Sequence, residues 1–388
     1  MHTVSPPPLR RIGAELLFRS TMCAGSRAFW DVRIQGADRL PDGPCFIYGN
    51  HSNNYDPFIL NLFTELGQST AGVMTMEHVE RGLVGWLFRS AGIEGTRKHE
   101  PEPHLIRRIY RMLEDGRRVV IFPEGGRRWD GRPAPWIRST AKIFQRAGVP
   151  VHPVLIHGSY VSWPRWARWP RPAHVVVEPL PAVDLTDCRT TDQAIQRLAQ
   201  PISADENRVD QSIQPAWAWR PADGIERLLY RDPDNGAFHV FSSPDGRTVM
   251  DRHGMHRFTV RADSHLIQPD GQVSNSADLY ARIRDLELIP APDGRILSHP
   301  ARIRTEHDTS RGKAWSPWRT GMASLHVDHV QMDDHILPLE HIRHMALERS
   351  DRIWLSGAGP RVYCHFPEPF SVLAWYDTLL RLAPHINA

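Results

Sequence analysis

Two short apolar runs in the first third of the chain each lead directly into a polar turn. Residues 45–48 (CFIY) are followed by NHSNNYDP at 50–57, and residues 119–122 (VVIF) are followed by PEGGR at 123–127. Short apolar runs that end in turn residues are typical of buried strands. In an α/β sheet, binding sites form just beyond the carboxyl ends of the strands. The two turns are therefore predicted to carry the functional site.

The residue types in these turns point to acid–base chemistry beside an anion site. His51 and Asp56 lie five positions apart, and a histidine with a carboxylate in reach can accept a proton from a hydroxyl. A glycine-rich turn with Glu124 and Arg127 suits a phosphate or an oxyanion. Each feature alone also has a purely structural explanation. Asp56 followed by Pro57 is a typical helix start, and Pro-Glu-Gly-Gly is a common turn.

The order and spacing of these turns resemble the glycerolipid acyltransferase family, which includes the lysophosphatidic acid acyltransferases. The family's first block, N-H-x-x-x-x-D-P, is matched at 50–57, and its third block, F-P-E-G-x-R, at 122–127. A second block, a glycine-led turn that ends in arginine, is similar to AGIEGTR at 91–97. The fourth block, an apolar V-P-V-x-P-V strand, is VPVHPV at 149–154. The resemblance covers about residues 30–200, roughly half of the chain.

The resemblance implies an acyltransferase that moves a fatty acyl group from a thioester donor to a lysophospholipid hydroxyl. The donor is acyl-CoA or an acyl-carrier protein, which acts as co-substrate, and no cofactor or metal is expected. His51 acts as general base and Asp56 orients it. The substrate-binding residues implied by the second and third blocks are Arg97, Glu124, Gly125 and Arg127.

The sequence departs from the family pattern where the acceptor would bind. Gly126 replaces the usual threonine of the third block, Arg128 replaces a serine, and Glu94-Gly95 replaces apolar residues of the second block. Two alternatives therefore stay open. The acceptor could be a lipid without phosphate, or the protein could be a non-catalytic lipid-binding or scaffold protein that keeps the fold.

In residues 31–215, short apolar runs typical of strands alternate with segments that have helical periodicity. This pattern predicts an α/β acyltransferase domain with a largely parallel sheet flanked by helices. The polar stretch 201–220 reads as a linker. Residues 222–388 predict a β-rich domain closed by a C-terminal helix, faintly similar to pleckstrin-homology domains. The expected strands of the first half are 44–49, 118–122, 149–156 and 173–178, with a further apolar stretch at 71–76, and its expected helices are 57–66, 103–115, 138–147 and 191–200. In the second half, strands are expected at 238–241, 247–250, 256–260 and 352–355, and a helix at 370–380.

Several features favour a membrane surface as partner. Residues 1–30 include an amphipathic segment at 9–19, and residues 162–171 interleave three tryptophans with three arginines. Residues 1–215 carry 27 basic and 22 acidic residues, whereas the rest carries 20 and 22. The acidic balance of the second half favours a protein partner there, and nothing resembles a nucleic-acid module.

No apolar run is long enough to cross a bilayer, and no signal peptide is evident. The four cysteines lie far apart, without metal-type or disulfide-type clustering. A cytoplasmic protein, peripheral to the inner face of the membrane, is therefore expected. The histidines between 326 and 344 fit no known metal motif.

Overall fold

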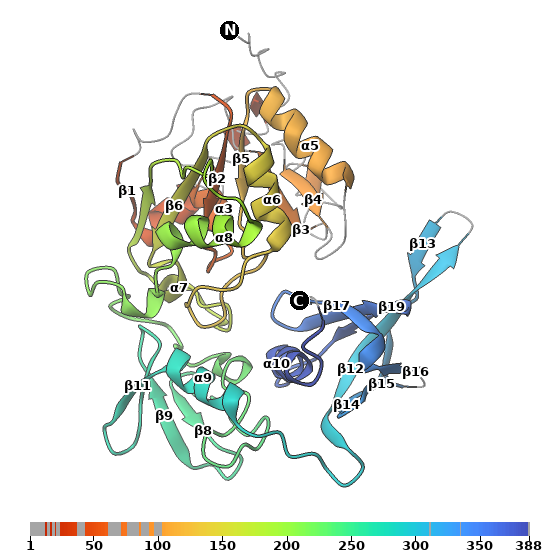
Figure 1. Cartoon of the computed structure of the whole chain (residues 1–388). Helices are drawn as coiled ribbons and strands as arrows, with labels where there is room; N and C mark the ends of the chain where they lie inside the picture. Colours follow the sequence, from red (N-terminus) through yellow and green to blue (C-terminus); the bar gives the residue numbers. More distant parts are fainter. Residues whose placement is uncertain are drawn as a thin grey trace. The chain divides into compact units, whose positions relative to one another are not determined.

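The computed structural model describes most of the chain, and the described residues divide into two compact units. The first unit lies within Met1–Arg165 and Pro170–Ala218, and the second comprises Trp166–Trp169 and Trp219–Ala388. The expected fold class is confirmed: a mostly parallel sheet with helices comes first, and antiparallel sheets with a C-terminal helix follow (Figure 1). The described residues are 12–13, 16–17, 20, 24–36, 43–60, 71–75, 85–86, 93–96, 103–309, 312–333 and 335–386.

The first unit is built on one sheet with the strand order β1-β7-β6-β2-β5-β3-β4. All neighbouring strands run parallel except β6 and β7, which are antiparallel. The two strands that end in the polar blocks, β2 and β5, pair directly in the middle of the sheet. The strands are β1 (Val32–Ile34), β2 (Cys45–Gly49), β3 (Ala71–Thr75), β4 (Ile93–Thr96), β5 (Arg118–Ile121), β6 (Val151–His157) and β7 (Val175–Pro179).

Side chains alternate between the two faces of this sheet, and each face has its own core. In β2, Phe46 and Tyr48 pack into one core, whereas Cys45 and Ile47 pack into the other. Helices α5, α6 and α8 cover the first face (Figure 1), and Trp30 and Ile59 help to cover the second. The helices are α2 (Ala24–Trp30), α3 (Asp56–Ile59), α5 (Pro103–Glu114), α6 (Arg138–Arg146), α7 (Ser159–Ser162) and α8 (Thr191–Ala199).

The second unit contains two antiparallel sheets. A four-stranded sheet has the order β11-β10-β9-β8, and an eight-stranded sheet has the order β16-β15-β14-β12-β19-β18-β17, with β13 paired to β12. Helices α9 (Ser276–Asp285) and α10 (Val372–Leu382) complete it. The strands are β8 (Thr248–Met250), β9 (His256–Val260), β10 (His265–Ile267), β11 (Val273–Asn275), β12 (Arg295–Thr309), β13 (Gly312–Trp315), β14 (Arg319–His326), β15 (His329–Met332), β16 (His335–Pro338), β17 (Ile342–Glu348), β18 (Arg352–Gly357) and β19 (Gly359–His365).

One expected strand of the second unit is wrong. Residues 238–241 form only an isolated bridge, Phe238 with Arg231, because His239 adopts a left-handed φ of 51° that interrupts extended backbone. The similarity to pleckstrin-homology domains stays a prediction. The amphipathic segment 9–19 falls mostly outside the described residues.

The tryptophan- and arginine-rich stretch 162–171 lies mostly in the interior. Trp166 and Arg171 are 0% and 1% exposed, and the Trp163 ring packs against Trp30 and Tyr55. Of the three tryptophans, Trp169 is the exposed one. The interfacial role expected for these tryptophans is therefore wrong for Trp166. In the described parts of the chain, every helix is too short or too polar to span a bilayer.

Candidate active site

The first polar block leaves β2 through an asparagine that prolongs the sheet. The Asn50 side-chain amide donates to the Ile156 carbonyl at 2.8 Å, and its carbonyl oxygen accepts the Ile156 N–H at 2.8 Å. Asn50 is fully buried, and the preceding Gly49 passes so close to β6 that a Cβ there would lie 2.8 Å from the Val154 carbonyl oxygen. The start of the loop is therefore fixed against β6.

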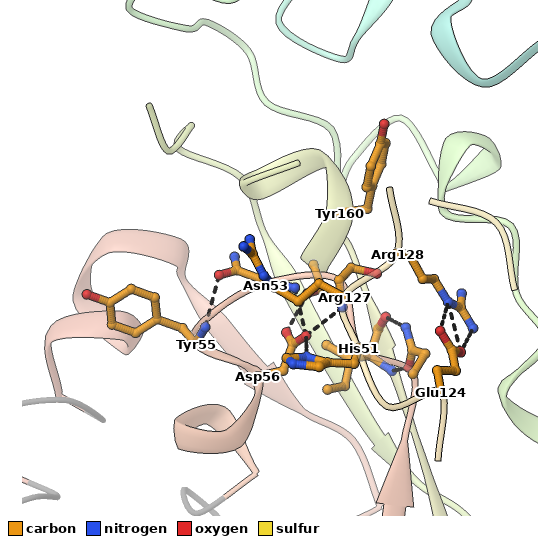
Figure 2. A network of polar contacts seen from close by, with 12 residues as sticks. His51, Asn53, Tyr55, Asp56, Glu124, Arg127, Arg128 and Tyr160 are labelled. Carbon is orange, nitrogen blue, oxygen red and sulfur yellow. Dashed lines mark hydrogen bonds and ion pairs between the residues drawn. The ribbon is translucent and has the colours of Figure 1, made fainter. Parts of the chain in front are cut away.

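His51 and Asp56 are brought together as their spacing suggested. Nδ1 of His51 lies 2.9 Å from Oδ2 of Asp56, whose side chain is fully buried, whereas the His51 side chain is 17% exposed (Figure 2). The His51 ring also stacks on Phe122, with centroids 4.3 Å apart. Because Nδ1 faces the carboxylate, Nε2 is the ring nitrogen that would exchange a proton with a substrate.

Asp56 stabilises the loop that carries the histidine. Its Oδ2 also accepts the backbone N–H groups of Ser52 and Asn53, each at 2.8 Å, and its Oδ1 accepts the hydroxyl of Ser159. The helix-cap explanation of Asp56 is wrong, because Tyr55 is the N-cap of α3 and makes no side-chain cap. A buried carboxylate with three such donors besides the imidazole is rigidly oriented.

The position of the Ser159 hydroxyl excludes a Ser–His–Asp triad with Ser159 as the nucleophile. In a serine nucleophile triad the hydroxyl donates to the histidine, and the carboxylate lies on the far side of the ring. Here Ser159 donates to Asp56, at the carboxylate end of the pair. The serine therefore orients the carboxylate and is not placed as a nucleophile activated by His51.

The third polar block requires a glycine at its turn. Gly125 has a φ of +67°, and a Cβ at this position would lie 2.3 Å from Cδ1 of Ile137. The Gly125 N–H donates to the Phe122 carbonyl at 3.1 Å, which closes the turn directly after β5.

The glutamate of this block pairs with the arginine that departs from the family pattern. Arg128 donates from Nε to both carboxylate oxygens of Glu124 at 3.0 Å and from Nη2 to Oε1 at 2.6 Å. Both side chains are 1% exposed, and Figure 2 shows this pair on the other side of His51 from Asp56. The Arg128 N–H donates to the His51 carbonyl at 2.8 Å, so the third block is joined to the loop that carries His51.

Among the predicted substrate-binding residues that the structure describes, Arg127 carries the positive charge, and it directly precedes Arg128, whose N–H is bonded to His51. It is partly exposed, and its carbonyl accepts Nη1 of Arg165 at 2.9 Å. Its backbone lies beside the His51 loop because the next residue is bonded to His51 (Figure 2). Arg97 lies outside the described residues, directly after β4.

Sequence reasoning missed Ser159 and Glu206. Glu206 is fully buried and accepts the Asn50 amide at 3.1 Å, the Ser52 hydroxyl, and the Tyr160 N–H at 2.7 Å. Burial raises the pKa of Glu206 to about 7, although Arg128, Ser52 and the Tyr160 N–H lower it. Ser159 follows the end of β6, so the strand-end signal could have found it, whereas Glu206 lay in the stretch interpreted as a linker.

Part of this chain matches a known family. Residues 31–157 match the family model described as Acyltransferase. The chloroplastic 1-acyl-sn-glycerol-3-phosphate acyltransferase BAT2 of Brassica napus is 30% identical over 135 residues, which are 34% of this chain and 38% of that protein. The 1-acyl-sn-glycerol-3-phosphate acyltransferase of Pseudomonas aeruginosa is 28% identical over 151 residues, 38% of this chain and 57% of that protein.

The chain thus spans between 38% and 57% of the length of these two curated relatives. A crystal structure of the 1-acyl-sn-glycerophosphate acyltransferase PlsC from Thermotoga maritima is 22% identical, with a TM-score of 0.43 over 50% of this chain and 80% of that one. Residues 31–157 are thus similar to an acyltransferase domain, and the N-terminal part of the chain is distantly related to the 1-acyl-sn-glycerol-3-phosphate acyltransferases.

Proposed function

We propose that the first unit transfers a fatty acyl group from a thioester donor, acyl-CoA or acyl-carrier protein, to the hydroxyl of a lysophospholipid. The observation that carries this proposal is the buried Asp56 carboxylate on Nδ1 of a partly exposed His51, 2.9 Å away. This geometry fixes the imidazole tautomer and stabilises the imidazolium that forms when His51 accepts a proton.

The reaction needs no covalent enzyme intermediate. Nε2 of His51 accepts the proton of the acceptor hydroxyl while the hydroxyl oxygen attacks the thioester carbonyl carbon. The tetrahedral intermediate collapses, the carbon–sulfur bond breaks, and the imidazolium returns the proton to the departing thiolate. The products are an ester and a free thiol, and His51 is regenerated neutral.

The third block would hold the acceptor beside this pair. Arg127 and the Gly125 turn supply positive charge and backbone at the junction with the His51 loop, and Arg97 is proposed to complete the phosphate site. Glu124 acts through Arg128, which it holds in place. Charge-assisted contacts between arginine and phosphate are among the stronger ones in proteins.

Replacement of the pair tests the reaction directly. We expect His51→Ala to abolish transfer and Asp56→Asn to lower kcat by about 10²-fold or more, because general-base catalysis contributes on this order. His174→Ala is the matched control, since His174 also pairs with an aspartate, Asp31, at 2.8 Å but on the surface. Wild-type turnover by folded His51→Ala would refute the assignment.

The second candidate function is acyl transfer to an acceptor lipid without phosphate. The Glu124–Arg128 pair supports this candidate. Because Arg128 is neutralised and buried, the third block offers an acceptor the charge of Arg127 alone. Assays of labelled acyl-CoA with lysophospholipids and neutral lysolipids, on wild type and Arg127→Ala, separate the two. If the acceptor carries a phosphate, Arg127→Ala should raise the KM for the acceptor more than the KM for the donor.

Two further points belong to the proposal. The excess of basic residues in 1–215 supports activity at an anionic membrane surface, with the enzyme bound peripherally. The β-rich second unit would recruit a protein partner.

A further inference from the structure

Glu206 is contributed by a segment that follows α8 and lies beyond the residues matched to the family model. It begins a short 3-10 helix, Glu206–Arg208, in which Asp205 caps the N–H of Asn207 at 3.0 Å. The Glu206 N–H donates to the Gly131 carbonyl at 3.0 Å, and the Asn207 amide donates to the Asp130 carbonyl at 2.6 Å. These three contacts fix the backbone around a carboxylate that is fully buried.

The two oxygens of Glu206 reach toward the two members of the proposed catalytic pair. Oε1 accepts the Asn50 amide and the Ser52 hydroxyl, the residues on either side of His51. Oε2 accepts the N–H of Tyr160, and the preceding residue, Ser159, donates its hydroxyl to Asp56. One side chain therefore holds both the histidine loop and the start of α7, which orients the aspartate.

Each of these contacts requires an acceptor, which a carboxylate provides at both oxygens. A glutamine at this position would present its NH₂ either to the Tyr160 N–H or to the Asn50 and Ser52 donors, so one side of the network would lose its bonds. Arg128 lowers the energy of the buried charge from a distance, while its own hydrogen bonds go to Glu124 and to the carbonyls of Ile202 and Ala204.

We propose that Glu206 is a positioning residue of the acyl-transfer site, which holds His51 and Asp56 in register through Asn50, Ser52 and the Tyr160 N–H. This inference rests on the proposed function. It places part of the catalytic architecture in residues 200–208, outside the family match.

The full-length protein with Glu206→Gln tests this role. We expect kcat to fall at least about tenfold while donor and acceptor KM stay within about twofold, because the variant misaligns the pair without touching substrate. The Nδ1 proton of His51, observed by NMR without substrate, should move or broaden. Asp377→Asn is the matched control, since Asp377 is a buried acceptor of the Tyr230 and Tyr280 hydroxyls in the second unit. It should leave kcat and the His51 signal unchanged.

The pH dependence of kcat in the wild type and in Glu206→Gln distinguishes a positioning role of Glu206 from a purely structural one. Burial raises the Glu206 pKa to about 7, with Asp56 adding to the rise and Arg128 opposing it. Protonated Glu206 resembles glutamine, so the ratio of wild-type to variant kcat should be largest above pH 7 and shrink as the pH falls below it.

The outcomes separate this inference from the proposed function. If His51→Ala is inactive but Glu206→Gln has wild-type kcat at pH 8 and an unchanged His51 signal, the role of Glu206 is refuted and the function stands. If His51→Ala is active, the function itself is refuted. Should Glu206→Gln not fold, Ser52→Ala decides, because it removes one donor to Oε1. Its kcat should fall severalfold, and a wild-type value would overturn the inference.

Discussion

Gly125 shows how strictly a single residue of the site is constrained. A side chain here would have to adopt a φ of +67° and would meet Ile137 at 2.3 Å. Gly148 is the matched control, because it has a φ of +64° with open space around it. We expect Gly148→Ala to cost about 1–2 kcal/mol of unfolding free energy. Gly125→Ala should cost about 1–3 kcal/mol more and lower activity, because Ile137 must move. Equal losses in denaturant titrations would show that the contact with Ile137 relaxes freely.

At the residue scale, the sequence predicted the pair but not its surroundings. Spacing and strand-end position were enough to bring His51 and Asp56 together, because both lie in one loop after one strand. Glu124 was expected to bind substrate, yet its side chain pairs with Arg128, a residue that the sequence analysis noted only as a departure from the family pattern. Glu206 could not be found from a local sequence pattern, because it contacts Ser52, which lies 154 positions away in sequence. Only the folded structure shows that its carboxylate is a buried hydrogen-bond acceptor.

At the scale of elements, the first part of the stretch 201–220 was misinterpreted, although the division between the two units at Ala218 and Trp219 does fall within this stretch. Its polar composition predicted a linker, but Ile202 and Glu206 are buried and Arg128 donates to the carbonyls of Ile202 and Ala204. Polar residues that satisfy buried groups have the same composition as solvated loops, so composition cannot separate them. The longer strands and helices of the first unit were predictable from apolar runs or helical periodicity, whereas the short elements β1, β4, α2 and α7 were not expected.

Arg128 joins three elements, and its removal should be costly. It links the third block, the His51 loop and the segment after α8. Arg128→Met leaves a buried Glu124 without its cation, which is expected to lower the unfolding free energy by about 3–5 kcal/mol. Arg138→Met removes an exposed pair with Asp192 and should change stability little. Equal, small changes for both variants in thermal unfolding would mean that the Glu124–Arg128 pair stabilises no more than a surface pair.

At the scale of the whole molecule, the chain does not pass from one unit to the next in a single step. Trp166–Trp169 group with the second unit, although residues 170–218 return to the first. Trp166 is fully buried, and Nη1 of Arg227 donates to its carbonyl at 3.3 Å. The Arg168 N–H donates to the Asp223 carbonyl at 3.0 Å, and the side chains of Arg168 and Arg227 both pair with Glu368.

This path predicts what a single cut between the units will do. Trp217 and Trp219 are 59% and 66% exposed, which makes them accessible to chymotrypsin, whereas Glu206 and Asn207 are buried. A simple linker would release two fragments that separate. Because Trp166–Trp169 belong to the N-terminal fragment but pack with residues 219–388, we expect the nicked protein to elute as one species in native gel filtration and to separate only in denaturant. Gly224→Ala supplies the contrast: a Cβ there would lie 2.2 Å from the Trp166 carbonyl oxygen, so the nicked variant should come apart more readily. Separation of the nicked wild-type fragments under native conditions would show that this segment does not hold the chain together.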